Sequence, residues 1–259
     1  RLHSHFLWLG LAAHIIGFDS LFMMCFEKRE KIMDMLETLS GNRVNYAMNI
    51  IGGARRDIND EIEKDLREKL SILKEDFKAI FDIYANDKTV ALRTKGVGVL
   101  TNEDAFIYGA CGPHGRASGM KDDVRKVDPY CSYDDFDFKA IVQAEGDVFS
   151  RAVVRLLEIE ESIKIIEQAL DNIPDTPINL GMKMPKVPKG EYFSRIEAPR
   201  GEVSYYVVSN GGQTNGRVNI HVPTFKNAAT VPVMLKDNTI ADAGLIVASI
   251  DPCFSCLDR

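Results

Sequence analysis

The longest apolar stretch of the chain lies at its N-terminus and limits the folds that this sequence can adopt. Residues 2–39 carry apolar side chains on most faces of a helix, and they end at Ser40-Gly41-Asn42, the composition of a helix C-terminal cap. A helix that is apolar on all sides has to be covered by other elements. The stretch therefore predicts a buried helix within a mainly helical core.

Part of this stretch, residues 6–26, is long and apolar enough to suggest a membrane helix. It contains His14, Asp19 and Ser20, however, and an ionised Asp is costly to place in lipid. We therefore expect no membrane span in this chain, but a buried helix of a multi-subunit core. Any attachment to a membrane would come through partner subunits.

Two more helices are predicted on either side of a Gly-rich middle. Residues 59–84 form a charged amphipathic pattern, and residues 148–173 return to helical periodicity. Between them, the Gly-rich residues 96–119 indicate tight backbone approaches rather than regular structure. No phosphate-loop spacing and no dinucleotide-binding glycine pattern occurs, so nucleotide binding is not supported.

The character of the sequence changes after residue 174. A Pro-rich connector over residues 175–190 precedes two β-rich runs, residues 203–209 and 217–222, joined by a Gly/Asn loop that is typical of a hairpin. A short helix over residues 228–235 and an apolar run over residues 243–250 follow. The predicted fold is mainly α with a small β element (α+β). We divide it into a helical region, residues 1–174, and a segment with the connector, the hairpin and a C-terminal metal-binding stretch, residues 175–259.

Composition and cysteine content narrow the classes of function. The 259 residues are 45% hydrophobic and 27% charged, which is typical of a globular protein, and the net charge of −6 favours neither nucleic acid nor an anionic membrane as partner. Five cysteines, an odd number with one close pair, do not make a disulfide framework. A reducing compartment is the better interpretation.

The one close pair is Cys253 and Cys256, whose C-x-x-C spacing lets two thiolates hold one metal. The same spacing occurs in zinc ribbons, thiol redox sites and ordinary buried cysteines. A zinc knuckle needs a second pair or histidines, and a thioredoxin-like site lies early in a βαβ unit. Spacing alone leaves these alternatives open.

The segment around this pair resembles the C-terminal signature of nickel–iron hydrogenase large subunits, in the sequence Asp251-Pro252-Cys253-Phe254-Ser255-Cys256-Leu257-Asp258-Arg259. The resemblance implies that Cys253 is a terminal ligand of nickel. It implies that Cys256 bridges nickel to an iron that carries cyanide and carbon monoxide. In that family a protease trims the precursor after the position of Arg259, which indicates a matured form. Arg rather than His at this position points to the membrane-bound, energy-converting class.

Two shorter matches extend the resemblance. The segment Glu197-Ala198-Pro199-Arg200-Gly201 is similar to the family's E-A-P-R-G, in which the arginine lies over the open coordination position. A permanent planar cation is suited to that place. Pro199 is then expected beside the metal centre, and Thr224 against an iron-bound cyanide. Asp251 is expected to shape the pocket together with Arg200.

Further blocks resemble the quinone-site subunit of respiratory complex I, and they extend the likeness to nearly the whole chain. They include His3-Ser4-His5-Phe6-Leu7-Trp8-Leu9-Gly10 and Gly112-Pro113-His114-Gly115-Arg116-Ala117-Ser118-Gly119. The cysteine pair separates the two relatives, because the complex I subunit lacks it. One departure is clear: the hydrogenase family also needs an R-x-C-G-x-C block, and no such block occurs here. We expect this block in an N-terminal part that the sequence does not include.

The resemblance implies reversible oxidation of H2 and reduction of protons at a nickel–iron centre. It implies an iron–sulfur cluster on a small partner subunit, further membrane subunits, and a peripheral place on the cytoplasmic face of the cell membrane. The alternative is a nickel-free, complex I-like subunit that forms a quinone-binding scaffold, and a third possibility is a bare zinc module. We expect Cys253 and Cys256 to be buried and close together, and Arg200 to lie above their sulfurs. We also expect that no later segment of the chain suffices to cover residues 2–26.

Overall fold

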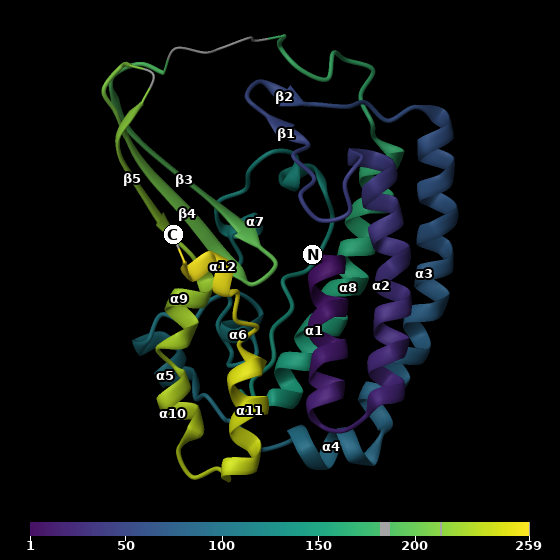
Figure 1. Ribbon diagram of the computed structural model, residues 1–259, viewed down its shortest axis with the longest axis vertical. Coiled ribbons are helices and arrows are strands. Elements are labelled where there is room, and N and C mark those ends of the chain that lie inside the picture. The colour runs from purple at the N-terminus through teal and green to yellow at the C-terminus, as the bar shows by residue number, and fades with distance from the viewer. Residues whose placement is uncertain (182–186, 213, 259) are drawn as a thin grey trace.

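A helical hairpin begins the fold in the computed structural model, which describes residues 1–181, 187–212 and 214–258 (Figure 1). Helices α1 (Leu2–Ile15) and α2 (Asp19–Ser40) run antiparallel, so the predicted single helix is two. The chain reverses at Gly17, whose φ of +84° is readily adopted only by glycine. Gly41, with φ +78°, ends α2 in the left-handed cap that the sequence predicts.

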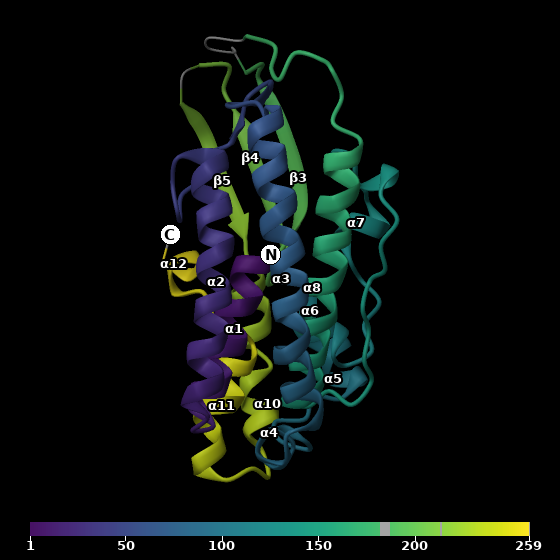
Figure 2. The same cartoon turned by 90° about the vertical axis from the view of Figure 1, so that its right-hand side faces the viewer.

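Helices α3 (Asp60–Asn86) and α8 (Val148–Asp171) complete a bundle with this hairpin (Figure 2). Side chains cap both N-termini: Asn59 accepts a hydrogen bond from the Ile62 amide, and Asp147 accepts one from the Ser150 amide at 2.7 Å. The apolar sides of all four helices meet in one core. Both helices were predicted from their periodicity, and both predictions are confirmed.

Helix α1 is packed on most of its surface. Phe6 and Leu9 are fully buried, and α1 contacts α2, α8 and the later helix α11. The expectation that no later segment covers the N-terminal helix was therefore wrong for most of α1, although Leu11 and Ile15 remain more than 40% exposed. Sequence periodicity did not show that a hairpin partner would follow directly. Within the described part of the chain, no helix combines the length and apolar character that crossing a membrane requires.

Short elements connect the long helices. Two short paired strands and five short helical segments lie between α2 and α8: β1 (Asn49–Ile50), β2 (Gly53–Ala54), α4 (Lys88–Thr94), α5 (Asn102–Ile107), α6 (Gly112–Arg116), α7 (Val124–Val127) and η1 (Tyr133–Asp135). The Gly-rich residues 96–119 contain tight turns at Gly109 and Gly119, as predicted, but they also form the short helices α5 and α6, which were not predicted.

An antiparallel sheet of three strands stands beside the upper end of the bundle (Figure 1). Its order is β3 (Gly190–Ala198), β4 (Gly201–Ser209) and β5 (Asn215–His221). The predicted hairpin corresponds to β4 and β5, whereas β3 was not predicted. Residues 182–186 of the predicted connector, which include Pro185, and Arg259 lie outside the described residues.

The C-terminal part is helical and returns to the bundle. It contains α9 (Pro223–Ala228), α10 (Val231–Leu235), α11 (Ile240–Ser249) and α12 (Phe254–Leu257). Met234, Ile246 and Ile250 pack with Leu100 in a second, smaller core. The mainly α fold with a small β element is confirmed. The division at residue 174 stays a prediction.

Candidate functional site

The C-terminal cysteine pair lies between the end of α11 and the short helix α12. Cys253 and Cys256 are joined as a disulfide, with their Cα atoms 5.3 Å apart. Both residues are half-buried, so the predicted closeness is confirmed and the predicted burial only in part. The amide of Cys253 donates to the hydroxyl oxygen of Thr224 at 3.1 Å, and Thr224 is 1% exposed. The Pro-Thr segment that begins α9 thus lies against the cysteine pair.

Arg200 is fixed to the residue that begins the cysteine segment. Its Nε donates to the backbone oxygen of Asp251 at 2.9 Å, and its Nη2 forms an ion pair with Asp251 Oδ1, also at 2.9 Å. Asp251 has a φ of +57°, and this left-handed residue turns the chain from α11 towards Cys253. The structure therefore brings Arg200, Asp251, Thr224 and Cys253 together. That Arg200 lies above the sulfurs stays a prediction.

The turn between β3 and β4 carries Arg200, and glycine is what lets α6 approach it. A Cβ on Gly112 would lie 2.3 Å from the Arg200 backbone oxygen, and Gly112 has a φ of +65°. On the other side, the Cys111 amide donates to Asn227 Oδ1 of α9 at 3.0 Å. The Gly-rich segment before α6 thus links the Arg200 turn to the helix that carries Thr224.

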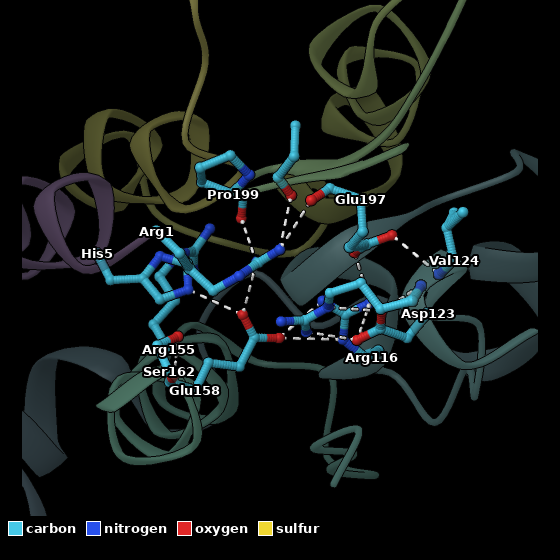
Figure 3. Close-up of polar contacts among 12 residues, drawn as sticks. Arg1, His5, Arg116, Asp123, Val124, Arg155, Glu158, Ser162, Glu197 and Pro199 are labelled. Atoms are coloured by element: carbon cyan, nitrogen blue, oxygen red, sulfur yellow. Dashed lines mark hydrogen bonds and ion pairs between the residues drawn. The ribbon is translucent and has the colours of Figure 1, made fainter. Parts of the chain in front are cut away.

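Pro199 takes part in the same turn through its backbone. Arg1 donates to the backbone oxygens of Glu197 at 3.0 Å, Ala198 at 3.2 Å and Pro199 at 3.4 Å (Figure 3). Three successive carbonyls of this turn are therefore held by one guanidinium. The predicted role of Pro199 beside a metal centre stays a prediction.

Behind the turn lies a buried ionic network that the sequence did not reveal. Glu158 of α8 is at its centre: Oε1 accepts from Arg116 Nη2 at 2.7 Å, and Oε2 accepts from His5 at 2.8 Å and Arg1 at 3.0 Å (Figure 3). Although burial opposes its charge, the guanidinium groups of Arg116 and Arg1 hold the pKa of Glu158 well below its usual range. Burial lowers the pKa of His5 to about 3, so the imidazole is neutral and donates to Glu158.

The network continues to the start of the Arg200 turn. Arg116 Nη1 contacts Glu197 Oε1 at 2.9 Å, and Glu197 Oε2 accepts from the amide of Val124 at 3.2 Å. Burial raises the pKa of Glu197 against the opposing effect of Arg116. His5, Arg116 and Glu197 lie in blocks that the sequence marks, but nothing in the sequence indicated that they meet at Glu158.

The donor set of the site fits half of a nickel–iron centre. When reduced, Cys253 and Cys256 offer two soft thiolates at a spacing that suits one metal ion. Thr224 supplies a buried hydroxyl beside them, and Arg200 supplies a fixed cation. Within the described ranges, no group of three or more His, Cys, Asp or Glu residues could hold a metal by itself. Two further thiolates would have to come from outside this set.

Comparison with known proteins gives one family and relatives of more than one kind. The family model described as the 49 Kd subunit of the respiratory-chain NADH dehydrogenase matches residues 16–184 and 178–259. The carbon monoxide-induced hydrogenase of Rhodospirillum rubrum is 41% identical over 270 residues, covering 100% of this chain and 72% of that protein. An NADH-quinone oxidoreductase subunit of Clostridium beijerinckii is 38% identical, covering 100% of this chain and 70% of that protein. The membrane-bound hydrogenase subunit alpha of Pyrococcus furiosus is also 38% identical, covering 100% of this chain and 64% of that protein. The chain therefore belongs to the oxidoreductase family of the respiratory-chain NADH dehydrogenase 49 Kd subunit.

Proposed function

We propose that this chain is the catalytic large subunit of a membrane-bound, energy-converting nickel–iron hydrogenase, which oxidises H2 and reduces protons reversibly. The observation that carries the proposal is the placement of the cysteine pair. The amide of Cys253 donates a hydrogen bond to the hydroxyl oxygen of Thr224. Arg200 forms an ion pair with Asp251, two residues before Cys253. Three motifs that are far apart in the sequence thus meet at one place, as the resemblance to hydrogenases requires.

Cys253 and Cys256 would hold the nickel–iron centre as thiolates, and the two thiolates of an R-x-C-G-x-C block would complete the ligand set. When bound, the centre supplies the redox chemistry that cleaves H2. Thr224 would present its hydroxyl to a ligand of the iron.

Arg200 is already oriented for a role at this site. Its Nε and Nη2 are used by Asp251, which leaves Nη1 without a hydrogen bond to any described residue. The side chain is 22% exposed, so Nη1 is free to donate towards a reacting group. A donor that is fixed before the reaction stabilises developing charge without reorganising.

The partners follow from the same proposal. Electrons would leave through an iron–sulfur cluster on a small subunit, and membrane subunits would couple the reaction to ion pumping. The names of the relatives, which include a membrane-bound hydrogenase subunit, support a place in such a complex. We place the chain on the cytoplasmic face of the cell membrane, as a peripheral part of the complex.

A nickel-free, complex I-like quinone-binding subunit is the second candidate, and two observations favour it. One is the 38% identity to the NADH-quinone oxidoreductase subunit of Clostridium beijerinckii. The other is a cavity of about 520 Å³ between α1, α2, α3 and α8, lined by apolar side chains together with Tyr46, Arg125, Tyr133 and Arg200. Such a cavity could receive an apolar ring with polar groups at one end.

Hydrogen-dependent reduction of a viologen dye by the purified complex tests the proposal. We expect activity in the natural complex and none in Cys256→Ser, because one metal ligand is removed. Cys131→Ser is the matched control, since Cys131 is exposed and outside the site. Equal activity in natural and Cys256→Ser complexes would contradict the metal role. A complex that reduces quinone but never consumes H2 would support the second candidate.

A further inference from the structure

The C-terminal end of α11 is held by side chains from two other helices. Trp8 of α1 donates its indole N–H to the backbone oxygen of Ala248 at 2.8 Å. Arg155 of α8 donates from Nη2 to the backbone oxygen of Ser249 at 3.2 Å. The guanidinium of Arg155 lies over the Trp8 ring, with Cζ 4.0 Å from the ring centroid. Trp8 and Arg155 thus contact each other, and both donate hydrogen bonds to the last carbonyls of α11.

The end of a helix needs such partners because its last carbonyls lack intrahelical donors. In α11 these carbonyls lie directly before the functional segment. Ile250 is the C-cap, and Asp251, with a φ of +57°, turns the chain towards Cys253. The path of the residues before Cys253 is therefore set by what holds Ala248 and Ser249.

Arg155 is an unusual residue for a purely structural role. It is 1% exposed, its Nε has no hydrogen-bond partner, and it forms no direct ion pair within the described part of the chain. A buried charge without a direct partner is unfavourable for folding. Burial lowers the pKa of Arg155 to about 10, and Asp251 is the carboxylate that opposes this effect most.

Asp251 has a buried carboxylate oxygen without a hydrogen-bond partner. Its Oδ1 is used by Arg200, whereas its Oδ2 is buried without a hydrogen-bond partner. The carboxylate therefore interacts with two cations: Arg200 is in direct contact, and Arg155 of α8 acts on it electrostatically without a hydrogen bond. Electrostatic attraction in a poorly hydrated interior acts beyond hydrogen-bond distance.

We propose that Arg155 is a positioning residue of the candidate site. It fixes the end of α11 and, together with Arg200, holds the Asp251 carboxylate, so that Arg200 and Cys253 keep their orientation. Arg155 touches no substrate and acts through Asp251. The inference rests on the proposed function only for its effect on hydrogen turnover.

Hydrogen–deuterium exchange on the purified complex tests the positioning directly. In Arg155→Met, the amides of residues 250–258 should exchange about tenfold faster, while α3 (Asp60–Asn86) stays unchanged. Arg155→Lys should restore most of the protection, because it keeps a cation and a donor near Ser249. In hydrogen turnover, Arg155→Met should lower kcat and leave the KM for H2 unchanged.

Two further variants serve as controls. Trp8→Phe keeps a ring beneath Arg155 but removes the donor to Ala248, so a smaller increase in exchange over residues 250–258 is expected. Arg125→Met removes another buried arginine, one that pairs with Asp123, and should leave residues 250–258 unchanged. If Arg155→Met does not fold, the rise in Trp8→Phe carries the test.

Unchanged exchange of residues 250–258 in both Arg155→Met and Trp8→Phe would overturn the inference. Equal loss of protection in Arg155→Lys and Arg155→Met would also overturn it, because the retained cation would then have no effect. A natural complex without hydrogen turnover would contradict the proposed function, whereas the exchange measurement would still decide the role of Arg155.

Discussion

Arg200 binds Asp251 through two atoms, Nε and Nη2, and this geometry needs a planar guanidinium. Lysine carries its three N–H groups on one nitrogen and cannot reproduce this planar contact made by two nitrogens. We therefore predict that Arg200→Lys lowers hydrogen turnover about 100-fold. Nickel and iron content should stay unchanged, since the metal ligands remain. Turnover and metal content are measured on the same purified complex.

Arg195→Lys is the matched control for this variant. Arg195 lies on β3, shortly before the turn that carries Arg200, and contacts the carboxylates of Asp128 and Glu202 near the surface. The same substitution there should leave turnover within about twofold, because exposed ion pairs contribute little. Unchanged turnover in Arg200→Lys would show that Arg200 has no catalytic role.

His5 makes the stability of the chain dependent on pH. Its pKa is about 3 in the folded chain, against 6.5 when free, because it is fully buried. Between these values the unfolded chain binds a proton that the folded chain does not, so stability falls as the pH drops through 6.5. Lowering the pH from 7 to 5 should remove on the order of 2 kcal/mol through His5. Glu158 adds nothing in this window, because its pKa is lowered from 4.5.

His5→Gln separates this effect from other groups, since the glutamine amide can still donate to Glu158. The variant should lose less stability between pH 7 and pH 5 than the natural chain, as measured by denaturant unfolding. His3 and His114, whose pKa values are also lowered by burial, contribute a dependence that both proteins share. An identical pH dependence in the two proteins would mean that His5 is not buried in its neutral form.

At the scale of elements, the contact between α6 and the β3–β4 turn depends on Gly112. A Cβ there would meet the Arg200 backbone oxygen at 2.3 Å, and backbone atoms cannot rotate away as a side chain can. Gly112→Ala should therefore cost about 3 kcal/mol or more and should displace Arg200. Thermal unfolding and hydrogen turnover both report this change.

Gly109→Ala is a close control, because Gly109 has nearly the same φ, +64°, but has nothing within 4 Å of the added Cβ. It should cost only the left-handed strain of about 1–2 kcal/mol and should leave turnover intact. Equal losses in the two variants would show that the close contact with Arg200 has no effect beyond backbone strain.

Elements with a strong local signal could be predicted from the sequence. Helix α3 has an apolar side and the Asn59 cap, and both are local properties. Strand β3 could not be predicted, because most of its side chains are exposed and it lacks the alternation of a half-buried strand. The break at Gly17 was missed because apolar residues lie on both sides of it, although the turn itself is exposed and Asp19 and Ser20 follow it directly.

Some residues of the candidate site could be predicted from the sequence, and others could not. Cys253, Arg200 and Thr224 were found because short motifs mark them, and the structure brings them together. Glu158 and Arg116 pair across 42 residues of sequence, and nothing local indicates which buried acid meets which buried base. Long-range ionic partners require the three-dimensional fold.

At the scale of the whole molecule, this chain covers most of its own N-terminal helix but leaves apolar side chains exposed on one face of the sheet. Tyr192, Ile196, Tyr205 and Val218 point to the same face by their register and are each more than 40% exposed. Because this face is unfavourable in water, we predict that the chain remains with an iron–sulfur subunit and membrane subunits during purification. Affinity purification of a tagged chain from solubilised membranes measures this association. A monodisperse free monomer in the soluble fraction would contradict the subunit assignment.

The proposed nickel–iron centre needs Cys253 and Cys256 as ligands. Elemental mass spectrometry of the purified complex tests it most directly, with Cys256→Ser as the control for metal bound elsewhere. Iron from iron–sulfur clusters remains in the control, so the decisive quantity is the difference between the two proteins. We expect a loss of about one nickel and one iron per chain in Cys256→Ser. A natural complex that contains no nickel, or that contains zinc in its place, would contradict it.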